Sequence, residues 1–250
     1  MEGFCDLRNM GFLGERAMQN LRWNRVDNVL KRALTRIGPM FSRRTIHRLD
    51  AAISYLETSR RLYSLGLRPS LRVRRKNELF DLVIKRVGEG RTLYLEFGVF
   101  QGESLRYWSN NLKNPLAQLH GFDSFIGLPE NWNIDSPKGF FSTNGEIPEI
   151  PDPRVRLFKG WFDETLPAYQ PPEHDKLVIN MDADIYSSTA YVLGTLESMI
   201  DVGTFIYFDE FADRFNELKA FTELQERTQM KFDLIGANEM LSQVVLQRIG

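Results

Sequence analysis

Acidic side chains gather where apolar runs of the sequence end. In "LVINMDADIYSST", residues 177–189, a run that predicts a buried strand stops at Asp182 and Asp184. The later run "FIYF" stops in the same way at Asp209 and Glu210. Carboxylates held this close are pushed toward protonation unless a cation offsets their charge. Oxygen ligands without a nearby His or Cys favour a hard ion, so the pattern predicts a site for Mg²⁺, Mn²⁺ or Ca²⁺. The alternative is that some of these residues cap helices or pair with lysines and arginines.

A second polar group surrounds "TLYLEFGVFQGES", in which Glu96, Gly98 and Gly102 span a strand end and a helix start. The spacing differs from the G-x-G-x-x-G of dinucleotide sites and lacks the G-K-S/T of a phosphate-binding loop. Gly98 would permit a tight turn, and Gly102 would let a ligand approach the helix N-terminus. Asp123 ends the next strand, where a carboxylate can bind both hydroxyls of a ribose, although it could also cap a turn. The group suits a nucleoside that carries an amine, which favours S-adenosylmethionine over NAD.

Further residues near these strand ends complete the predicted cofactor site. The aromatic pair after "FKG" could stack on an adenine ring, and is equally suited to the core. The remaining members are the serines that follow the first two strands and the first aspartate of "DAD". These further predicted cofactor contacts are Ser104, Ser124, Trp161, Phe162 and Asp182. His120 lies on a strand and is predicted to be a packed residue. The Gly-rich stretch "SPKGFFSTNGE" predicts a mobile lid.

The elements that must position these residues alternate between strand and helix. From residue 77 onward, strand patterns alternate with helical patterns, and the chain ends in a hairpin pattern. Such alternation predicts an α/β fold, a largely parallel sheet with helices on both faces and ligands at the carboxyl ends of its strands. Residues 1–76 predict an N-terminal helical extension or lid without strands. Helices are expected over 26–37 and from an N-cap at Asp50 to Gly66, and a third over "KNELFDLVIKRV".

The composition is that of an ordinary globular protein. The chain has 250 residues, 42% hydrophobic and 26% charged, with a formal net charge of −1. No apolar run approaches the roughly 18 residues of a membrane span. The start of the chain lacks the core of a signal peptide, and the single Cys5 suits a reducing cytoplasm, where we expect the protein.

The two parts of the chain differ in charge. Residues 1–78 hold 17 Lys and Arg against 7 Asp and Glu, and the rest holds 15 against 26. The asymmetry predicts a basic layer that packs on an acidic body or a second subunit, or that meets an anionic substrate. A homodimer or higher homo-oligomer is therefore expected. We expect no nucleic-acid or membrane partner, because no recognition motif accompanies the charge.

The motifs carry a resemblance to a known family. "LEFGVFQGESL", "GFDSFIGLPE", "VRLFKGWFDETLP", "MDADIYSST" and "FIYFDEF" occur in the order seen in TylF-like proteins. Residues 77–250 thus resemble the macrocin- and mycinamicin-type O-methyltransferases, which use S-adenosylmethionine and often modify sugar hydroxyls of natural products. The resemblance implies a class I methyltransferase fold, a Rossmann-like sheet of seven strands with the last antiparallel. The hairpin pattern at the end of the chain agrees with that topology.

The resemblance also implies functional residues. Mg²⁺ would be held by Asp184, Asp209 and Glu210. The family more usually has Asp at the last of these positions, and Gly where this chain has Ala183. Apart from the resemblance, Asp184 is the candidate for the catalytic base, because no histidine is suitably placed in the sequence. The more distant catechol-type enzymes place a lysine where this chain has Ser187. The implied reaction is Mg²⁺-dependent methyl transfer to a hydroxyl of a small molecule, a sugar or another diol.

Two alternatives of different kinds stay open at the level of the sequence. A metal-dependent glycosyltransferase could use "DAD" to bind Mn²⁺ and a sugar nucleotide, although such enzymes do not need the glycine-bearing first loop. The other alternative is a non-catalytic protein that keeps the fold for interactions. A protein without catalytic activity would be free to lose the carboxylates of the site, whereas this chain has Glu96, Asp123, Asp184 and Asp209.

Overall fold

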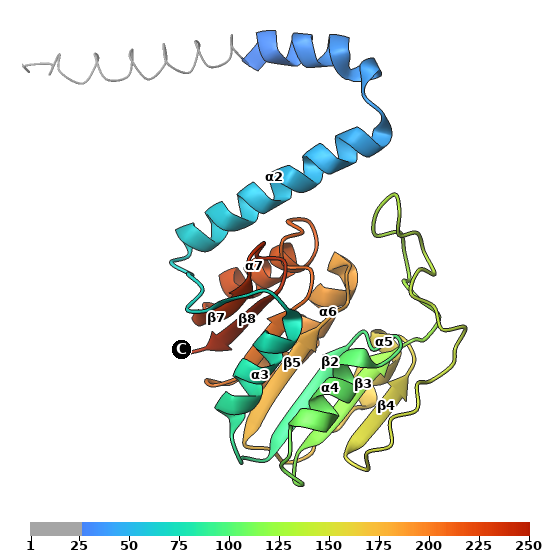
Figure 1. Ribbon diagram of the computed structural model, residues 1–250, viewed down its shortest axis with the longest axis vertical. Coiled ribbons are helices and arrows are strands. Elements are labelled where there is room, and N and C mark those ends of the chain that lie inside the picture. The colour runs from blue at the N-terminus through green and yellow to red at the C-terminus, as the bar shows by residue number, and fades with distance from the viewer. Residues whose placement is uncertain (1–26) are drawn as a thin grey trace, which may run out of the picture. The chain divides into compact units, whose positions relative to one another are not determined.

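A single sheet forms the centre of the fold in the computed structural model, which describes residues 27–250 (Figure 1). Its spatial order is β1-β7-β8-β6-β5-β2-β3-β4. The strands are β1 (Arg72–Val73), β2 (Thr92–Phe97), β3 (Gln118–Asp123), β4 (Val155–Lys159), β5 (Lys176–Met181), β6 (Phe205–Phe208), β7 (Phe232–Asn238) and β8 (Val244–Arg248). All neighbours are parallel except that β8 runs antiparallel to β6 and β7. This confirms the predicted seven-stranded sheet as β2 to β8, and the terminal hairpin with it. The short β1, which pairs with β7, was not predicted.

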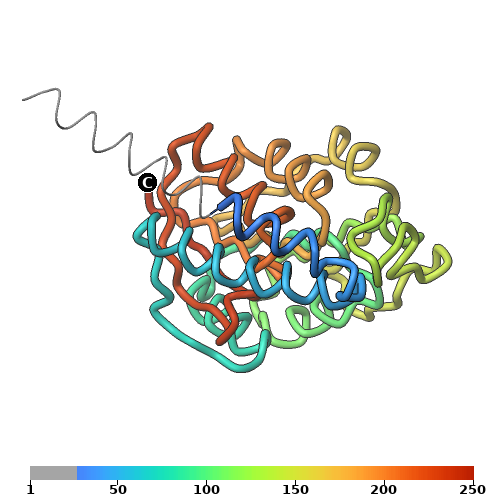
Figure 2. Tube along the Cα trace, turned by 90° about the horizontal axis from the view of Figure 1, so that it is seen from above, coloured from blue at the N-terminus to red at the C-terminus, as the bar shows by residue number. Residues whose placement is uncertain are grey.

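Helices cover both faces of this sheet, as the alternating pattern predicted. The helical segments are η1 (Gly38–Met40), α2 (Arg43–Ser64), α3 (Lys76–Val87), α4 (Glu103–Asn111), α5 (Phe162–Thr165), η2 (Leu166–Ala168), α6 (Tyr186–Leu196), η3 (Glu197–Met199) and α7 (Glu217–Thr228). The chain is also helical over 27–37. Figures 1 and 2 show α3 and α4 on one face and α5 and α6 on the other. Within residues 27–250 no helix is long and apolar enough to span a membrane.

Side chains on the two faces of the sheet pack into two separate hydrophobic cores. In β2 all six residues are buried, as expected for a central parallel strand. Leu93, Leu95 and Phe97 join the core beneath α6 and α7, whereas Tyr94 joins the core beneath α3 and α4. Tyr94 lies 4.5 Å from Trp108 of α4, measured between ring centroids. Because successive side chains alternate between faces, Glu96 also projects toward the α3 face.

The N-terminal boundary of α2 differs from the prediction. The sequence suggested Asp50 as N-cap, but the helix begins at Arg43, so Asp50 lies in its interior. Ser42 takes the capping role, because its Oγ accepts a hydrogen bond from the backbone N–H of Thr45 (3.1 Å). The predicted stop is confirmed: Gly66 follows the helix with a φ of +72°, a conformation typical of a C-terminal glycine.

The contacts within the chain divide it after Ala51. The sequence placed the boundary later, after residue 76. The later part of α2 belongs to the second unit because it bonds to the body of the fold. Thr58 Oγ1 donates to the carbonyl of Ala212 (3.2 Å), and Thr58 is fully buried.

Gly121, in the middle of β3, supports a test of the packing. A Cβ at this position would lie 2.7 Å from Val99 Cγ2 and 2.8 Å from Leu157 Cδ2. We expect Gly121→Ala to lower the free energy of unfolding by roughly 1–3 kcal/mol, because overpacked cores must shift their side chains. Gly194 of α6 is exposed and has open space around its Cα, so Gly194→Ala should raise stability by about 0.5–1 kcal/mol. Urea denaturation of both variants measures the difference, and equal effects would contradict the packing described.

Candidate functional site

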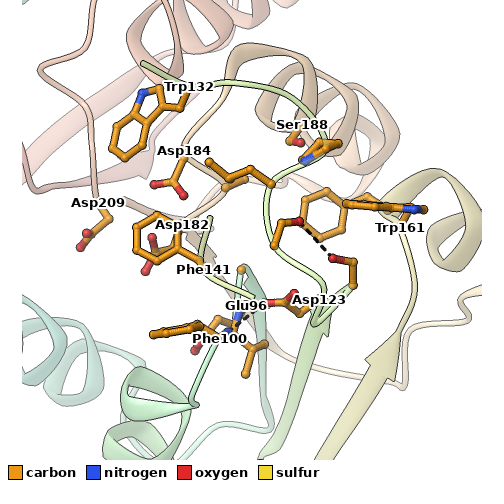
Figure 3. A pocket seen from close by; sticks show the side chains of 18 of the residues that line it. Glu96, Phe100, Asp123, Trp132, Phe141, Trp161, Asp182, Asp184, Ser188 and Asp209 are labelled. Atoms are coloured by element: carbon orange, nitrogen blue, oxygen red, sulfur yellow. Dashed lines mark hydrogen bonds between the residues drawn. The ribbon is translucent and has the colours of Figure 1, made fainter. Parts of the chain in front are cut away.

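A cavity of about 740 Å³ opens at the carboxyl ends of β2, β3, β5 and β6 (Figure 3). Open α/β sheets bind their ligands at this edge. All but one of the predicted site residues line it, namely Glu96, Gly98, Ser104, Asp123, Ser124, Trp161, Phe162, Asp182, Asp184, Asp209 and Glu210. The exception is Gly102. The structure therefore brings the two acidic groups of the sequence to one cavity.

Gly98 allows the end of β2 to touch the end of β5. It has a φ of +94°, and a Cβ at this position would lie 1.8 Å from the carbonyl oxygen of Asp182. The N–H of Asp182 in turn donates to the carbonyl of Phe97 (2.9 Å). The predicted tight turn is present, but the closer constraint is this backbone contact with the neighbouring strand, which only glycine permits.

Gly102 lies where the loop after β2 enters α4. It caps α4 with a φ of +76°, and a Cβ there would lie 3.2 Å from Ile150 Cδ1 and 3.3 Å from Pro148 Cγ. The residue thus faces the side chains of a loop rather than the cavity. The glycine thus serves the turn and this packing, and the approach of a ligand to the helix here stays a prediction.

Glu96 is a buried carboxyl group that is held in place by hydrogen-bonded neighbours. Its side chain is 1% exposed, and Oε2 accepts a hydrogen bond from the hydroxyl of Tyr94 (2.5 Å). Asn180 Nδ2 donates to the same hydroxyl (2.9 Å), while Asn180 Oδ1 is buried without a partner. Burial raises the pKa of Glu96 to about 7, against the opposing effect of these hydrogen bonds. A carboxyl group fixed in this way is suited to accept a hydrogen bond from a cationic group of a ligand.

Asp123 anchors the loop that follows β2. Its Oδ2 accepts hydrogen bonds from the N–H groups of Val99 and Phe100 (2.8 Å each), and its Oδ1 accepts one from Phe125 (2.7 Å). Phe100 and Phe125 have φ values of +49° and +60°, which are unusual for bulky residues. The carboxylate therefore stabilises strained backbone at the edge of the cavity. Its contact with a ribose stays a prediction.

The remaining predicted cofactor contacts are two aromatic residues and two serines of the cavity lining. Phe162 packs edge-on against Phe97, with ring centroids 5.6 Å apart, so it serves the core as well as the lining. Trp161 precedes α5 and is half-buried. Ser124 Oγ closes a turn within its own loop, and Ser104 lies in the first turn of α4. Of these residues, Trp161 has the free ring that stacking on an adenine would need.

Asp184 lies in strained backbone. Its φ is +60°, and the carbonyl of Ala183 accepts a hydrogen bond from the N–H of Ile185 (2.6 Å) across it. A three-residue turn around a residue with positive φ is rare and costly, although Asp tolerates the left-handed region better than most residues. Non-glycine residues in such conformations cluster at functional sites. The turn presents the Asp184 carboxylate to the cavity (Figure 3).

Four carboxylates share this part of the cavity without a cationic partner. Within residues 27–250 no lysine or arginine forms an ion pair with Asp182, Asp184, Asp209 or Glu210. Burial, followed by the charges of Glu210 and Asp209, raises the pKa of Asp184 to about 7. Burial and Asp209 likewise raise the pKa of Glu210 to about 7, and the pKa of Asp182 lies well above its usual range. The group is therefore short of positive charge.

The chemistry of this group fits a hard cation, because every donor is an oxygen and none is neutralised. In the described part of the chain, however, no three His, Cys, Asp or Glu side chains are placed so as to hold a metal ion. Asp209 Oδ1 accepts hydrogen bonds from the Tyr207 hydroxyl (2.5 Å) and Gln243 Nε2 (3.0 Å). The magnesium site at Asp184, Asp209 and Glu210 stays a prediction.

Glu217 is a residue of the site that the sequence did not reveal. It is fully buried in the first turn of α7, and its Oε2 accepts a hydrogen bond from the N–H of Glu210 (2.9 Å). Its Oε1 is buried without a partner, and burial raises its pKa well above the usual range. An acidic residue in the first turn of a helix is common for electrostatic reasons, so the local pattern carried no sign of this contact.

The histidines of the body contribute nothing to the cavity lining. His120 is buried in β3, with Nδ1 sharing a hydrogen bond with the hydroxyl of Tyr169 (2.6 Å), which confirms its packed role. His174 Nδ1 lies 2.8 Å from the carbonyl of Pro172. The carboxylates of the lining are therefore the candidates for a proton acceptor in this cavity.

The long loop between β3 and β4 lines the cavity and is held by hydrogen bonds to other segments. Residues 136–146, the predicted lid, pair in part with the residues that follow β3. Nearer the tip, Ser187 Oγ donates to Glu130 Oε1 (2.6 Å), and Trp132 Nε1 donates to Asp213 Oδ2 (3.2 Å). These bonds tie the loop to the start of α6 and to the segment after β6. The movement of this loop stays a prediction.

Comparisons with known proteins agree with this geometry. The profile of the macrocin-O-methyltransferase (TylF) family matches residues 72–240. An 8-demethyl-8-(2,3-dimethoxy-α-L-rhamnosyl)-tetracenomycin-C 4′-O-methyltransferase of Streptomyces olivaceus is 33% identical over 139 residues, 47% of this chain and 52% of the relative. A demethyldecarbamoylnovobiocin O-methyltransferase of Streptomyces niveus is 35% identical over 63 residues, 25% of this chain and 23% of the relative. The matches thus span about half of the first relative and about a quarter of the second.

Solved structures show the same fold. The O-methyltransferase NovP superimposes with a TM-score of 0.53 at 23% identity, covering 70% of this chain and 78% of NovP. The calicheamicin methyltransferase CalS11 superimposes with a TM-score of 0.52 at 21% identity, covering 77% of this chain and 91% of CalS11. The predicted class I methyltransferase fold is confirmed.

The raised pKa values predict an unusual dependence of stability on pH. Asp184, Glu210 and Glu96 hold protons in the folded protein up to a pKa of about 7, whereas the unfolded chain releases them near pH 4. The folded state binds more protons between these values, so its stability in a chelator should fall as the pH rises from about 4 to about 7 and level off above that. Each group contributes roughly 1.4 kcal/mol per unit of pKa displacement. Urea denaturation at several pH values measures the slope.

Two further measurements make this prediction specific. Asp184→Asn should flatten the slope, because it removes one of the protons concerned. Added Mg²⁺ should stabilise the protein more at about pH 8 than at about pH 5, since only ionised carboxylates bind it. Stability that rises across this range in chelator would show that cations of the protein already neutralise the site.

Proposed function

Because the chain belongs to the macrocin-O-methyltransferase (TylF) family, we propose that it transfers a methyl group from S-adenosylmethionine to a hydroxyl of a small molecule. The proposed acceptor is a sugar or another diol of a natural product, and Mg²⁺ is the proposed second cofactor. The observation that carries the proposal is a single cavity lined by two groups of carboxylates. Glu96 and Asp123 form one group, the cofactor end, and Asp184, Asp209 and Glu210 form the other, the acceptor end (Figure 3). One end suits the cofactor and the other suits the acceptor.

The cofactor end offers a partner for each part of S-adenosylmethionine. Glu96 and Asp182 would accept hydrogen bonds from the ammonium group, and their negative charge favours the sulfonium. The side of Asp123 that faces the cavity would meet the ribose, since a carboxylate can accept more bonds than the three amides supply. The ring of Trp161 would lie against the adenine.

The acceptor end holds the groups that would activate a hydroxyl. Mg²⁺ held by Asp184, Asp209 and Glu210 would lower the pKa of a hydroxyl bound to it. Asp184 would take the proton of that hydroxyl, because none of the described histidines lines the cavity. A new bond then forms between the hydroxyl oxygen and the methyl carbon, and the bond from that carbon to sulfur breaks, which leaves a neutral thioether. The protein's part is to orient the two reactants and to exclude water.

The names of two relatives support a natural-product acceptor. The relative from Streptomyces olivaceus is named for methylation at the 4′ oxygen of a rhamnosyl tetracenomycin, and the one from Streptomyces niveus for a novobiocin derivative. The loop that carries Trp132 lines the cavity and would contact the acceptor.

The rival functions make different binding predictions. A glycosyltransferase would bind a sugar nucleotide in the presence of Mn²⁺, and a non-catalytic protein would bind neither kind of ligand. The family match and the strand order favour the methyltransferase. Calorimetric titration with S-adenosylhomocysteine and with a sugar nucleotide, each with and without metal, separates the three.

Asp184→Asn tests the roles given to the acceptor end. Asparagine tolerates the left-handed backbone of this position, so the variant should fold. Methyl transfer to an accepted glycoside should fall by at least ~100-fold, because a proton acceptor and a metal ligand are lost together. Affinity for S-adenosylhomocysteine should change less than about threefold, because that cofactor binds at the other end. Release of S-adenosylhomocysteine from a panel of glycosides and catechols measures the transfer.

Asp233→Asn is the matched control, because Asp233 is exposed on β7 outside the cavity. It should leave both transfer and binding unchanged. Full activity of Asp184→Asn would contradict the assignment of Asp184, and loss of cofactor binding would show that the two ends of the cavity are not separate.

A further inference from the structure

The charges that line the cavity are strongly unequal. Eight carboxylates line it, and they are Glu96, Glu103, Asp123, Asp163, Asp182, Asp184, Asp209 and Glu210. The cationic side chains of the lining are Lys76 and Lys138. This surplus of negative charge favours ammonium, sulfonium and metal cations, but it repels any carboxylate of a ligand. A ligand that carries a carboxylate must place it beside one of the two lysines.

Lys76 lies at the cofactor end of the cavity. It is the first residue of α3, the helix that covers the sheet face from which Glu96 projects. It lines the same cavity as Glu96 and Asp182, the proposed ammonium acceptors. Lys138, by contrast, lies on the exposed loop between β3 and β4.

The ammonium of Lys76 has no partner within residues 27–250. No carboxylate of that range lies within ion-pair distance of it, and no side-chain hydrogen bond of Lys76 occurs there. The nearby Arg74 differs, because it faces Glu239 at 3.7 Å.

The position of Lys76 is also unfavourable for its own helix. A cation at a helix N-terminus opposes the macrodipole, whereas Lys85 and Arg86 in the last turn of α3 are favourably placed. Neither an ion pair nor helix stability therefore accounts for a half-buried lysine at this point.

We propose that Lys76 binds the carboxylate at the amino-acid end of S-adenosylmethionine, while Glu96 and Asp182 accept hydrogen bonds from its ammonium group. The proposal rests on the proposed function. An α-amino acid carries its two charges on one carbon, so its site needs a cation and an anion side by side. Lys76, Glu96 and Asp182 supply that combination. The compact ammonium of lysine, with three donors, suits a single carboxylate among competing acids.

Calorimetric titration of the full chain with two ligands tests the proposal. One is S-adenosylhomocysteine, and the other is its decarboxylated analogue, which keeps the adenosine, the thioether and the amine. Lys76→Met should weaken S-adenosylhomocysteine binding by about 10- to 100-fold, as expected for a charged hydrogen bond. Binding of the decarboxylated analogue should not weaken by more than about twofold. Lys76→Arg should keep much of the affinity for the carboxylate ligand.

Lys85→Met is the matched control, because it makes the same change in the same helix at an exposed position outside the cavity. It should bind both ligands as the unaltered chain does. An equal loss for both ligands in Lys76→Met would overturn the proposal in favour of a structural role, and no loss for either would overturn it outright. If the unaltered chain binds neither ligand, the proposed function itself fails, so the two failures are distinguishable.

Discussion

The backbone contact between Gly98 and Asp182 is the constraint on which the site depends. β2 and β5 are neighbours in register, and a residue with a Cβ at position 98 would force their ends apart. With the ends in contact, the acidic residues that terminate both strands face one cavity. The same contact sets the start of the strained turn at Asp184. A substitution at Gly98 would therefore move the cofactor end and the acceptor end together.

Closeness of the carboxylates has an electrostatic consequence that links stability to function. Buried acids without cations hold their protons at a cost in folding free energy, and a bound cation removes that cost. The surrounding structure maintains the arrangement through groups outside the cluster. Glu217 orients the backbone of Glu210, and Tyr207 donates to Asp209. The site is thus shaped for ligands that bring positive charge, and within residues 27–250 the cationic side chains of its lining are Lys76 and Lys138.

Elements with a strong local signal were predicted well. The alternating apolar runs identified β2, β3, β5 and β6, and the helical period of "KNELFDLVIKRV" matched α3 to the residue. The predicted start of a helix was wrong where two residues could both serve as its N-cap. Asp50 has the chemistry of an N-cap, but Ser42 caps the helix earlier, and good helix-forming residues between them allow the longer helix. The two-residue β1 has no periodicity of its own and exists because β7 offers it an edge.

The sequence by itself determined which carboxylates would meet, because strand ends of a parallel sheet share one edge and each acidic pair directly follows an apolar run. It also determined the family, through five ordered motifs. The tertiary structure decided the partners of each side chain. The hydrogen bonds from the Val99 and Phe100 amides to Asp123, the hydrogen bond from Glu210 to Glu217 and the cavity that Lys76 shares with Glu96 all bring together residues from separate parts of the chain. Such contacts depend on how helices pack across the sheet, and no local periodicity or spacing encodes that packing.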